Sequence, residues 1–256
     1  MDAGASLHRH ANELAVAVLF YTRLPVPHRG EIAAGDLAQA SWAAPVAGAL
    51  VGALGAAAYA LAHGLGLPPS VAAGLAVATT LIATGGLHED GLADTADGFG
   101  AGATRERRLE IMRDAWIGAF GACALVLSLA LRWSALATLA DPLRVAATLI
   151  AAHAAARAML PVLMALTPPA RTDGLSATAG APPADSVAAA ALLGVVVLAL
   201  GLGLKGGFVA LLVLIAGAAA MRWLTMRKIG GQTGDVLGAT EQLGEILVML
   251  TAAAIG

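Results

Sequence analysis

The sequence has 256 residues, of which 59% are hydrophobic and only 12% are charged. Soluble domains carry about 25% charged residues, so this composition, with a mean hydropathy of +0.79, excludes an ordinary soluble protein and favours a membrane protein. The formal net charge of −2 shows no basic excess, and we expect no nucleic-acid partner.

The N-terminal region precedes the first long apolar segment. Glu13 lies beside a short apolar run and no small-residue cleavage site follows, so we expect the N-terminus to stay attached rather than to be removed as a signal peptide. Residues 14–21 could form an additional element that is re-entrant or lies on the membrane surface. Arg23, in the rigid segment Phe20–Pro27, could contact a phosphate or anchor the chain at lipid headgroups.

Seven segments are long and apolar enough to cross a bilayer, which takes roughly 20 residues. They are residues 41–65, 68–86, 116–140, 142–166, 184–204, 206–221 and 235–256. We therefore predict an all-α fold, a polytopic transmembrane helical bundle of about seven spans (six to eight). Abundant small residues permit close helix approach, and we expect a single integral membrane domain over residues 1–256 with a catalytic loop at about 87–115.

Four carboxylates and a histidine interrupt the apolar sequence within Thr84–Gly98. Asp90, Asp94 and Asp97 are spaced i, i+4, i+7, which places all three on one face of a helix. Like charges aligned in this way repel one another unless a cation binds them, so the spacing indicates a divalent metal. Carboxylate oxygens suit Mg²⁺, and Glu89 is a further candidate ligand. The alternative is a solvated helix whose acids merely end a membrane span.

A basic cluster follows the acids and consists of Arg105, Arg107 and Arg108. Guanidinium groups bind phosphate oxygens in a bidentate manner, so metal-binding carboxylates followed by this cluster predict a pyrophosphate site. The same arginines could instead, or in addition, fix the orientation of the chain in the membrane.

The distribution of basic residues predicts which end of the bundle faces the cytoplasm. If residues 87–115 lie there, the alternation of spans places the N-terminal region, 167–183 and 222–234 on the same side. These four regions hold 11 of the 15 lysines and arginines. The positive-inside rule therefore assigns the acidic motif to the cytoplasmic side.

Further polar residues fall within or beside the apolar segments. Glu241 and Glu245 share a helix face in a span, where a central charge costs about 2.5–3.5 kcal/mol on insertion scales, so we expect them to face a polar cavity or to pair with Arg157. Asp235 could simply cap the helix that begins there. Cys123 is the only cysteine, which excludes an intrachain disulfide.

Five segments in chain order resemble the cobalamin synthase family, the adenosylcobinamide-GDP ribazoletransferases. They are Tyr21–Pro27, Thr84–Gly98, Glu106–Asp114, Ile117–Gly121 and Gln232–Ala239, so the resemblance runs nearly end to end. Trp116 stands where the family often carries a polar or basic residue, and no role is assigned to it.

The resemblance implies a multi-pass enzyme of the bacterial inner membrane that depends on Mg²⁺ and has its active site on the cytoplasmic side. Its substrates would be adenosylcobinamide-GDP and α-ribazole or the 5′-phosphate of α-ribazole. The products would be adenosylcobalamin, or its 5′-phosphate, and GMP. The enzyme would lie in the lipid bilayer, and it could form an oligomer.

The resemblance also implies roles for the polar residues. The carboxylates on the metal, among them Asp94 and Asp97, would stabilise the charge that develops on the pyrophosphate, and the basic cluster would hold the GMP side. Asp114, Glu89 or His88 could accept the proton of the attacking hydroxyl group, and the sequence does not rank these three because geometry decides first.

Two other functions remain as alternatives at this point. A CDP-alcohol phosphotransferase also combines membrane helices with clustered aspartates, but Gly102 stands here where that pattern has an arginine. A secondary transporter would use Glu241, Glu245 and Arg157 as an ion pathway.

Overall fold

The computed structural model describes residues 3–27 and 32–255, and every regular element in these ranges is helical. The prediction of an all-α fold is confirmed. In chain order the elements are α1 (Ala3–Tyr21), α2 (Ala34–Gln39), η1 (Ala40–Ala43), α3 (Ala44–Gly64), α4 (Pro69–Thr84), α5 (Leu87–Ala101), α6 (Arg105–Ile111), α7 (Ala119–Leu139), α8 (Pro142–Leu166), α9 (Leu175–Ala179), α10 (Ala184–Lys228) and α11 (Gly234–Ile255).

The long apolar helices make this a multi-pass membrane protein. In the described ranges, five helical stretches are long and apolar enough to cross a bilayer: Gly35–Gly64, α7, α8, α10 and α11. The pair α4 and α5, bent by 90°, adds a sixth if it counts as one crossing. Because the 45 residues of α10 cover two of the predicted spans, the set agrees roughly with the expected seven.

Gly203 divides α10 into two helices, since its backbone is not helical (φ 71°, ψ 168°). A Cβ added at Gly207 would lie 2.8 Å from the carbonyl oxygen of Leu198, whereas nine residues of straight helix would separate these positions by about 13 Å. The two halves therefore fold back on each other. The second half continues to Lys228, so the predicted span 206–221 was too short.

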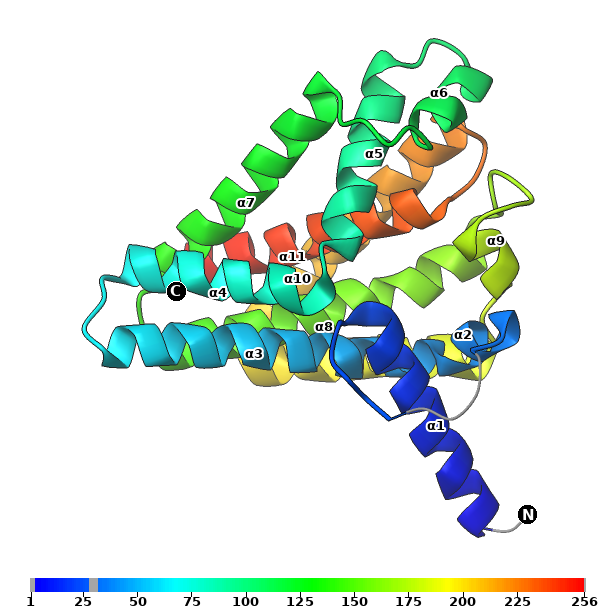
Figure 1. Ribbon diagram of the computed structural model, residues 1–256. Coiled ribbons are helices and arrows are strands. Elements are labelled where there is room, and N and C mark those ends of the chain that lie inside the picture. The colour runs from blue at the N-terminus through cyan, green and yellow to red at the C-terminus, as the bar shows by residue number, and fades with distance from the viewer. Residues whose placement is uncertain (1–2, 28–31, 256) are drawn as a thin grey trace.

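Small residues bring the central helices into close contact. Helices α3 and α8 run side by side (Figure 1), and a Cβ added at Gly52 of α3 would lie 2.5 Å from the carbonyl oxygen of Leu149 in α8. A Cβ added at Gly48 would overlap the carbonyl group of His153. Backbone therefore packs directly on backbone, as the abundance of Gly and Ala predicted.

The bend between α4 and α5 turns the acidic segment away from the membrane-spanning direction. Gly85 and Gly86 both have positive φ values, 68° and 74°, which glycine adopts without steric penalty. Helix α5 then packs against the start of α11, because a Cβ added at Gly91 would lie 2.8 Å from the carbonyl oxygen of Asp235. We place α5, with its four acids, outside the spans, and α4 alone has only 16 residues.

The additional N-terminal element expected at 14–21 is the end of a longer helix, α1. Val16 and Ala17 are buried against Ala40 and Ala43 of η1, while the beginning of α1 projects away from the bundle (Figure 1). Only the last turns of α1 therefore belong to the packed body.

Candidate functional site

A cavity of about 330 Å³ opens where α1, α2, α5, α8 and α11 meet. Most of its lining is apolar, but His88 and Asp90 of α5, Asp235 of α11 and Arg171 reach it together. Concave, mainly apolar sites with a few converging polar groups are the usual form of ligand sites. This cavity is the candidate active site.

The acids of α5 point in different directions. Asp90 is exposed and lines the cavity, whereas Glu89 and Asp97 are buried. Asp94, between Asp90 and Asp97 in the sequence, is half-buried. Burial, followed by the negative charges of Asp90 and Asp235, raises the pKa of Asp94 to about 7. The carboxylates at this end of α5 and α11 therefore repel one another.

Asp97 binds the beginning of α7 instead of sharing a site with Asp90. One of its carboxylate oxygens accepts the N–H of Gly118 at 2.7 Å and the other accepts the N–H of Gly121 at 2.9 Å. A helix N-terminus leaves such N–H groups unsatisfied and attracts negative charge. The carboxylate of Asp97 is thus engaged in holding α7 against α5.

Glu89 lies on the opposite side of α5 from the cavity, in a network of buried charges. Its Oε1 is 3.0 Å from the Nη2 of Arg132 on α7. The Nη1 of Arg132 is 3.0 Å from the Oε2 of Glu245 on α11. Buried charges in membrane proteins are normally paired in this manner. These ion pairs fix α5 to two spans, which is a structural function for Glu89.

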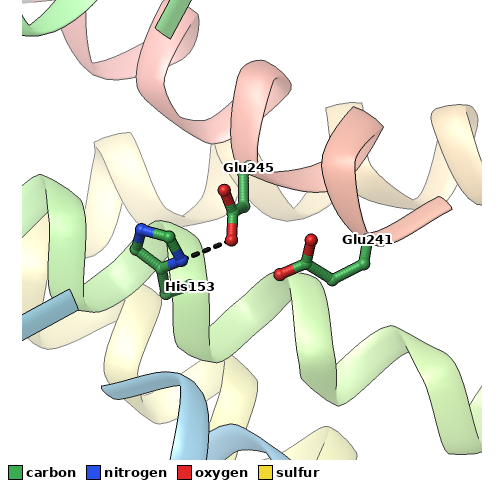
Figure 2. Close-up of side chains that lie close together, drawn as sticks. All are labelled: His153, Glu241 and Glu245. Carbon is green, nitrogen blue, oxygen red and sulfur yellow. Dashed lines mark ion pairs between the residues drawn. The ribbon is translucent and has the colours of Figure 1, made fainter. Parts of the chain in front are cut away.

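The expected pairing of the carboxylates in the last span is confirmed. Figure 2 shows Glu241 and Glu245 of α11 pointing toward His153 of α8, and Glu245 is ion-paired with His153. The Nη1 of Arg157 is 2.5 Å from the Oε1 of Glu241 and 3.1 Å from the Oε1 of Glu245. The carboxylates are neutralised by a neighbouring cation, which does not favour their use as an ion pathway.

The carboxylate oxygens of Asp90, Asp94 and Asp97, predicted to bind a metal, do not meet at one point. Among the described residues, only His153, Glu241 and Glu245 bring ligand atoms within 4.8 Å of one another. The guanidinium group of Arg157 already binds both of these glutamates. Asp90, Asp94 and Asp97 do not converge to this degree because Asp97 turns to the amides of α7.

His88 connects the cavity with the buried network. It lines the cavity, its Nδ1 lies 3.4 Å from the Oε2 of Glu241 and 3.3 Å from the Nη2 of Arg157, and its ring stacks on Tyr21 with centroids 5.8 Å apart. Of the three residues considered for proton acceptance, His88 alone lines the cavity, within the described part of the chain.

Asp114, Trp116 and Arg23 lie away from the cavity. The exposed Asp114 accepts the backbone N–H of Trp116 at 3.2 Å in the connection from α6 to α7, and the side chain of Trp116 is 85% exposed. Arg23 packs against Gly85 at the bend between α4 and α5. None of the three belongs to the cavity lining.

The predicted basic cluster binds the protein's own backbone. Arg105 donates from Nε to the carbonyl oxygen of Ile229 at 2.8 Å, and Arg108 donates from Nη1 to that of Lys228 at 3.1 Å. The exposed Arg107 pairs with Glu110 at 3.0 Å. Arg105 and Arg108 therefore attach α6 to the end of α10, and none of the three arginines lines the cavity.

Arg171 and Asp235 are the charged cavity residues to which the sequence assigned no role in ligand binding. Their side chains are 3.6 Å apart (Nη2 to Oδ2), and the buried Nη1 of Arg171 has no hydrogen-bond partner among the described residues. Just before Arg171, the N–H of Ala170 donates to the backbone oxygen of Gln232 at 2.8 Å, so this segment lies beside the one that precedes α11. The sequence contained one indication of a role for Arg171, namely that it is the only basic residue of 167–183.

The helix-capping hypothesis for Asp235 is replaced by a cap from its neighbour. Thr233 accepts the N–H of Val236 at 3.3 Å through its hydroxyl oxygen. The carboxylate of Asp235 instead lines the cavity, where its Oδ2 accepts a hydrogen bond from the hydroxyl group of Thr233 at 3.1 Å.

Comparison with known proteins identifies the family of this chain. Residues 13–253 match the family described as cobalamin-5-phosphate synthase. A protein from Bradyrhizobium diazoefficiens named adenosylcobinamide-GDP ribazoletransferase is 57% identical over 94% of this chain and 93% of its own length. Proteins of the same name from Mesorhizobium japonicum and Ralstonia nicotianae are 51% and 42% identical, over 94% and 96% of this chain and 92% and 96% of their own lengths. No solved structure is detectably similar. The family match includes every charged residue of the cavity, and the chain belongs to the cobalamin-5-phosphate synthase family.

Proposed function

We propose that this protein is an adenosylcobinamide-GDP ribazoletransferase that performs the last assembly step of the nucleotide loop of cobalamin. The relatives that carry this name cover nearly the whole chain. The observation that carries the proposal within the structure is the cavity in which acids of α5 and α11 face a guanidinium group with an unpartnered nitrogen. Neither alternative, the CDP-alcohol phosphotransferase or the transporter, has comparable support.

The reaction is a displacement at phosphorus. The ribose 3′-hydroxyl oxygen of α-ribazole, or of its 5′-phosphate, forms a bond to the phosphorus that carries the cobinamide arm. The bond from that phosphorus to the bridging oxygen breaks, GMP leaves with the electron pair, and the hydroxyl proton is released. Such reactions depend mostly on positioning and on neutralising charge, which suits a site built from few polar groups.

The donor set of the cavity fits Mg²⁺. Asp90 and Asp235 offer carboxylate oxygens. Burial, followed by the negative charges of Asp90 and Asp235, raises the pKa of Asp94, and a dication would relieve the repulsion among these carboxylates. Magnesium in phosphate-transfer sites is held by one or two carboxylates together with substrate oxygens, so a complete protein cage is not needed. A bound Mg²⁺ would neutralise charge on the pyrophosphate.

Arg171 is the residue that we assign to the substrate phosphates. Its free Nη1 is buried beside Asp235, and guanidinium groups bind phosphate oxygens strongly. This assignment replaces the one made for Arg105, Arg107 and Arg108, whose partners are backbone carbonyls and Glu110.

We also propose that the protein resides in the bacterial inner membrane with the cavity on the cytoplasmic side. The basic residues concentrate in the regions that flank the acidic segment, 11 of 15 by sequence, and the positive-inside rule places such regions in the cytoplasm. The substrates would then arrive from the compartment that contains nucleotides.

Release of GMP by the purified protein tests the function. With adenosylcobinamide-GDP, α-ribazole and Mg²⁺, we expect GMP to form, and we expect EDTA to stop it. Asp94→Asn should lower turnover by roughly two orders of magnitude while the protein remains folded. Glu106→Gln, an exposed carboxylate on α6, is the matched control and should retain activity. Unchanged GMP release in the presence of EDTA, or near wild-type turnover of Asp94→Asn with Mg²⁺, would contradict the metal assignment.

A second substitution distinguishes the two arginine assignments. Arg171→Gln should raise the KM for adenosylcobinamide-GDP by roughly tenfold or more, because a charge-assisted phosphate contact is lost, with little change in the KM for α-ribazole. Arg9→Gln, at an exposed position of α1, is the control. If Arg107→Gln weakens substrate binding and Arg171→Gln does not, the assignment of Arg171 is wrong.

A further inference from the structure

A second cavity, of about 610 Å³, lies at the end of the bundle opposite the acidic site. The end of α7, the beginning of α8, the turn of α10 at Gly203 and the last turn of α11 form its walls (Figure 1). Leu139, Leu202 and Val209 give it an apolar lining, and Arg144 and Lys205 are its charged residues. This cavity plays no part in the proposed reaction.

The charges of Arg144 and Lys205 are not compensated by the protein. No hydrogen bond or ion pair joins either side chain to another described residue. The nearby carboxylate of Asp141 accepts the backbone N–H of Arg144 at 2.8 Å and so caps α8. It is absent from the cavity lining. Two exposed cations therefore share one cavity that contains no acid among its described residues.

The position of these cations in the chain is unusual. Of the 15 basic residues, 11 belong to the regions that flank the acidic site, and Arg132 and Arg157 take part in buried ion pairs. Arg144 and Lys205 are the two that remain. Because basic residues are disfavoured on the side of the membrane opposite the cytoplasm, their convergence on a single cavity calls for a ligand.

Apolar side chains surround the cations on the membrane-facing side. Leu143 at the rim of the cavity is 80% exposed and Ile255 is 51% exposed. A ligand that matches the cavity must therefore combine an anionic group with a hydrocarbon part. Basic pockets between membrane helices bind phospholipid headgroups for the same physical reason.

We propose that this cavity binds an anionic phospholipid, with its phosphodiester group between Arg144 and Lys205 and an acyl chain along the apolar wall. Arg144 forms hydrogen bonds with phosphate oxygens, and Lys205 contributes a point charge. The site lies on α7, α8, both halves of α10 and α11, so an occupied cavity ties together the ends of five spans.

Native mass spectrometry of the full-length protein, released from detergent, tests the site. Phosphatidylglycerol is compared with phosphatidylcholine of identical acyl chains. We expect the protein to retain phosphatidylglycerol preferentially, and the double variant Arg144→Gln/Lys205→Gln to lose roughly tenfold or more of that affinity. Arg227→Gln is the matched control because this cation lies over Trp223, at 4.9 Å from the ring centroid, away from the cavity.

Further measurements show whether the ligand is a phospholipid or a free phosphate ion. They also show whether a variant has lost a ligand contact or has failed to fold. The single variant Arg144→Lys should retain most of the binding, and the thermal transition of each variant in detergent establishes that it is folded. Inorganic phosphate at millimolar concentration should not displace the lipid. The proposal is overturned if phosphatidylglycerol binds no better than phosphatidylcholine, if the double variant binds like Arg227→Gln, or if inorganic phosphate competes fully. Loss of GMP release in Asp94→Asn has no bearing on these outcomes.

Discussion

At the scale of single residues, we expect the fold to be sensitive to substitution of Arg132, because this residue is buried and pairs with both Glu89 and Glu245. Removing one partner from a buried ion pair leaves an uncompensated charge and costs about 3–5 kcal/mol. We therefore expect Arg132→Met to lower the thermal transition of the detergent-solubilised protein markedly. Adding Glu89→Gln to this variant should recover part of the loss.

The exposed pair Arg107–Glu110 supplies the comparison. Exposed ion pairs contribute about 0–1 kcal/mol, so Arg107→Met should leave the transition almost unchanged. Equal transitions for Arg132→Met and Arg107→Met would show that the buried network does not stabilise the fold.

The roles of individual acids were only partly predictable from the sequence. The 3.6-residue period of a helix placed Asp90, Asp94 and Asp97 on one face, but it did not show that Glu89, named as a candidate ligand, pairs with Arg132. The partners of Asp97 are amides 21 and 24 residues further along the chain, and no local sequence pattern predicts such distant contacts. Arg171 is equally hidden, because a contact between remote segments brings it to the cavity.

At the scale of helices, the contact between α3 and α8 depends on the absence of side-chain atoms. A Cβ at Gly48 would collide with the backbone of His153, and overpacking a close contact costs about 1–3 kcal/mol or more. We expect Gly48→Val to lower the thermal transition and the yield of folded protein. Gly64→Val is the control in the same helix, since nothing lies within 4 Å of that position. A similar effect of both substitutions would contradict the role of this contact.

The helices themselves were largely predictable, since apolar length identifies spans independently of tertiary contacts. The turn within α10 was anticipated as a boundary between 204 and 206, close to Gly203. The bend after α4 lies where the predicted span 68–86 ended and the predicted loop 87–115 began, but no pattern in the sequence indicated that the chain turns by 90° there.

At the scale of the whole molecule, the orientation in the membrane can be measured with single cysteines. In a Cys123→Ser background, Leu65→Cys marks the turn after α3, where Leu65 is exposed, and Glu106→Cys marks α6 at the other end (Figure 1). If the acidic site faces the cytoplasm, an impermeant maleimide should label Leu65→Cys in intact spheroplasts and Glu106→Cys only after permeabilisation. The reverse pattern would contradict the proposed orientation.

The size of the acidic cavity has a consequence for how a corrinoid is handled. Sites of about 300–1,000 Å³ enclose drug-sized molecules, and this one, at about 330 Å³, is at the lower limit. A corrin macrocycle joined to a guanine nucleotide greatly exceeds that size. Under the proposed function, the ring system would stay outside the protein body and only the phosphate-bearing tail would enter, so selectivity would depend on the tail far more than on the ring.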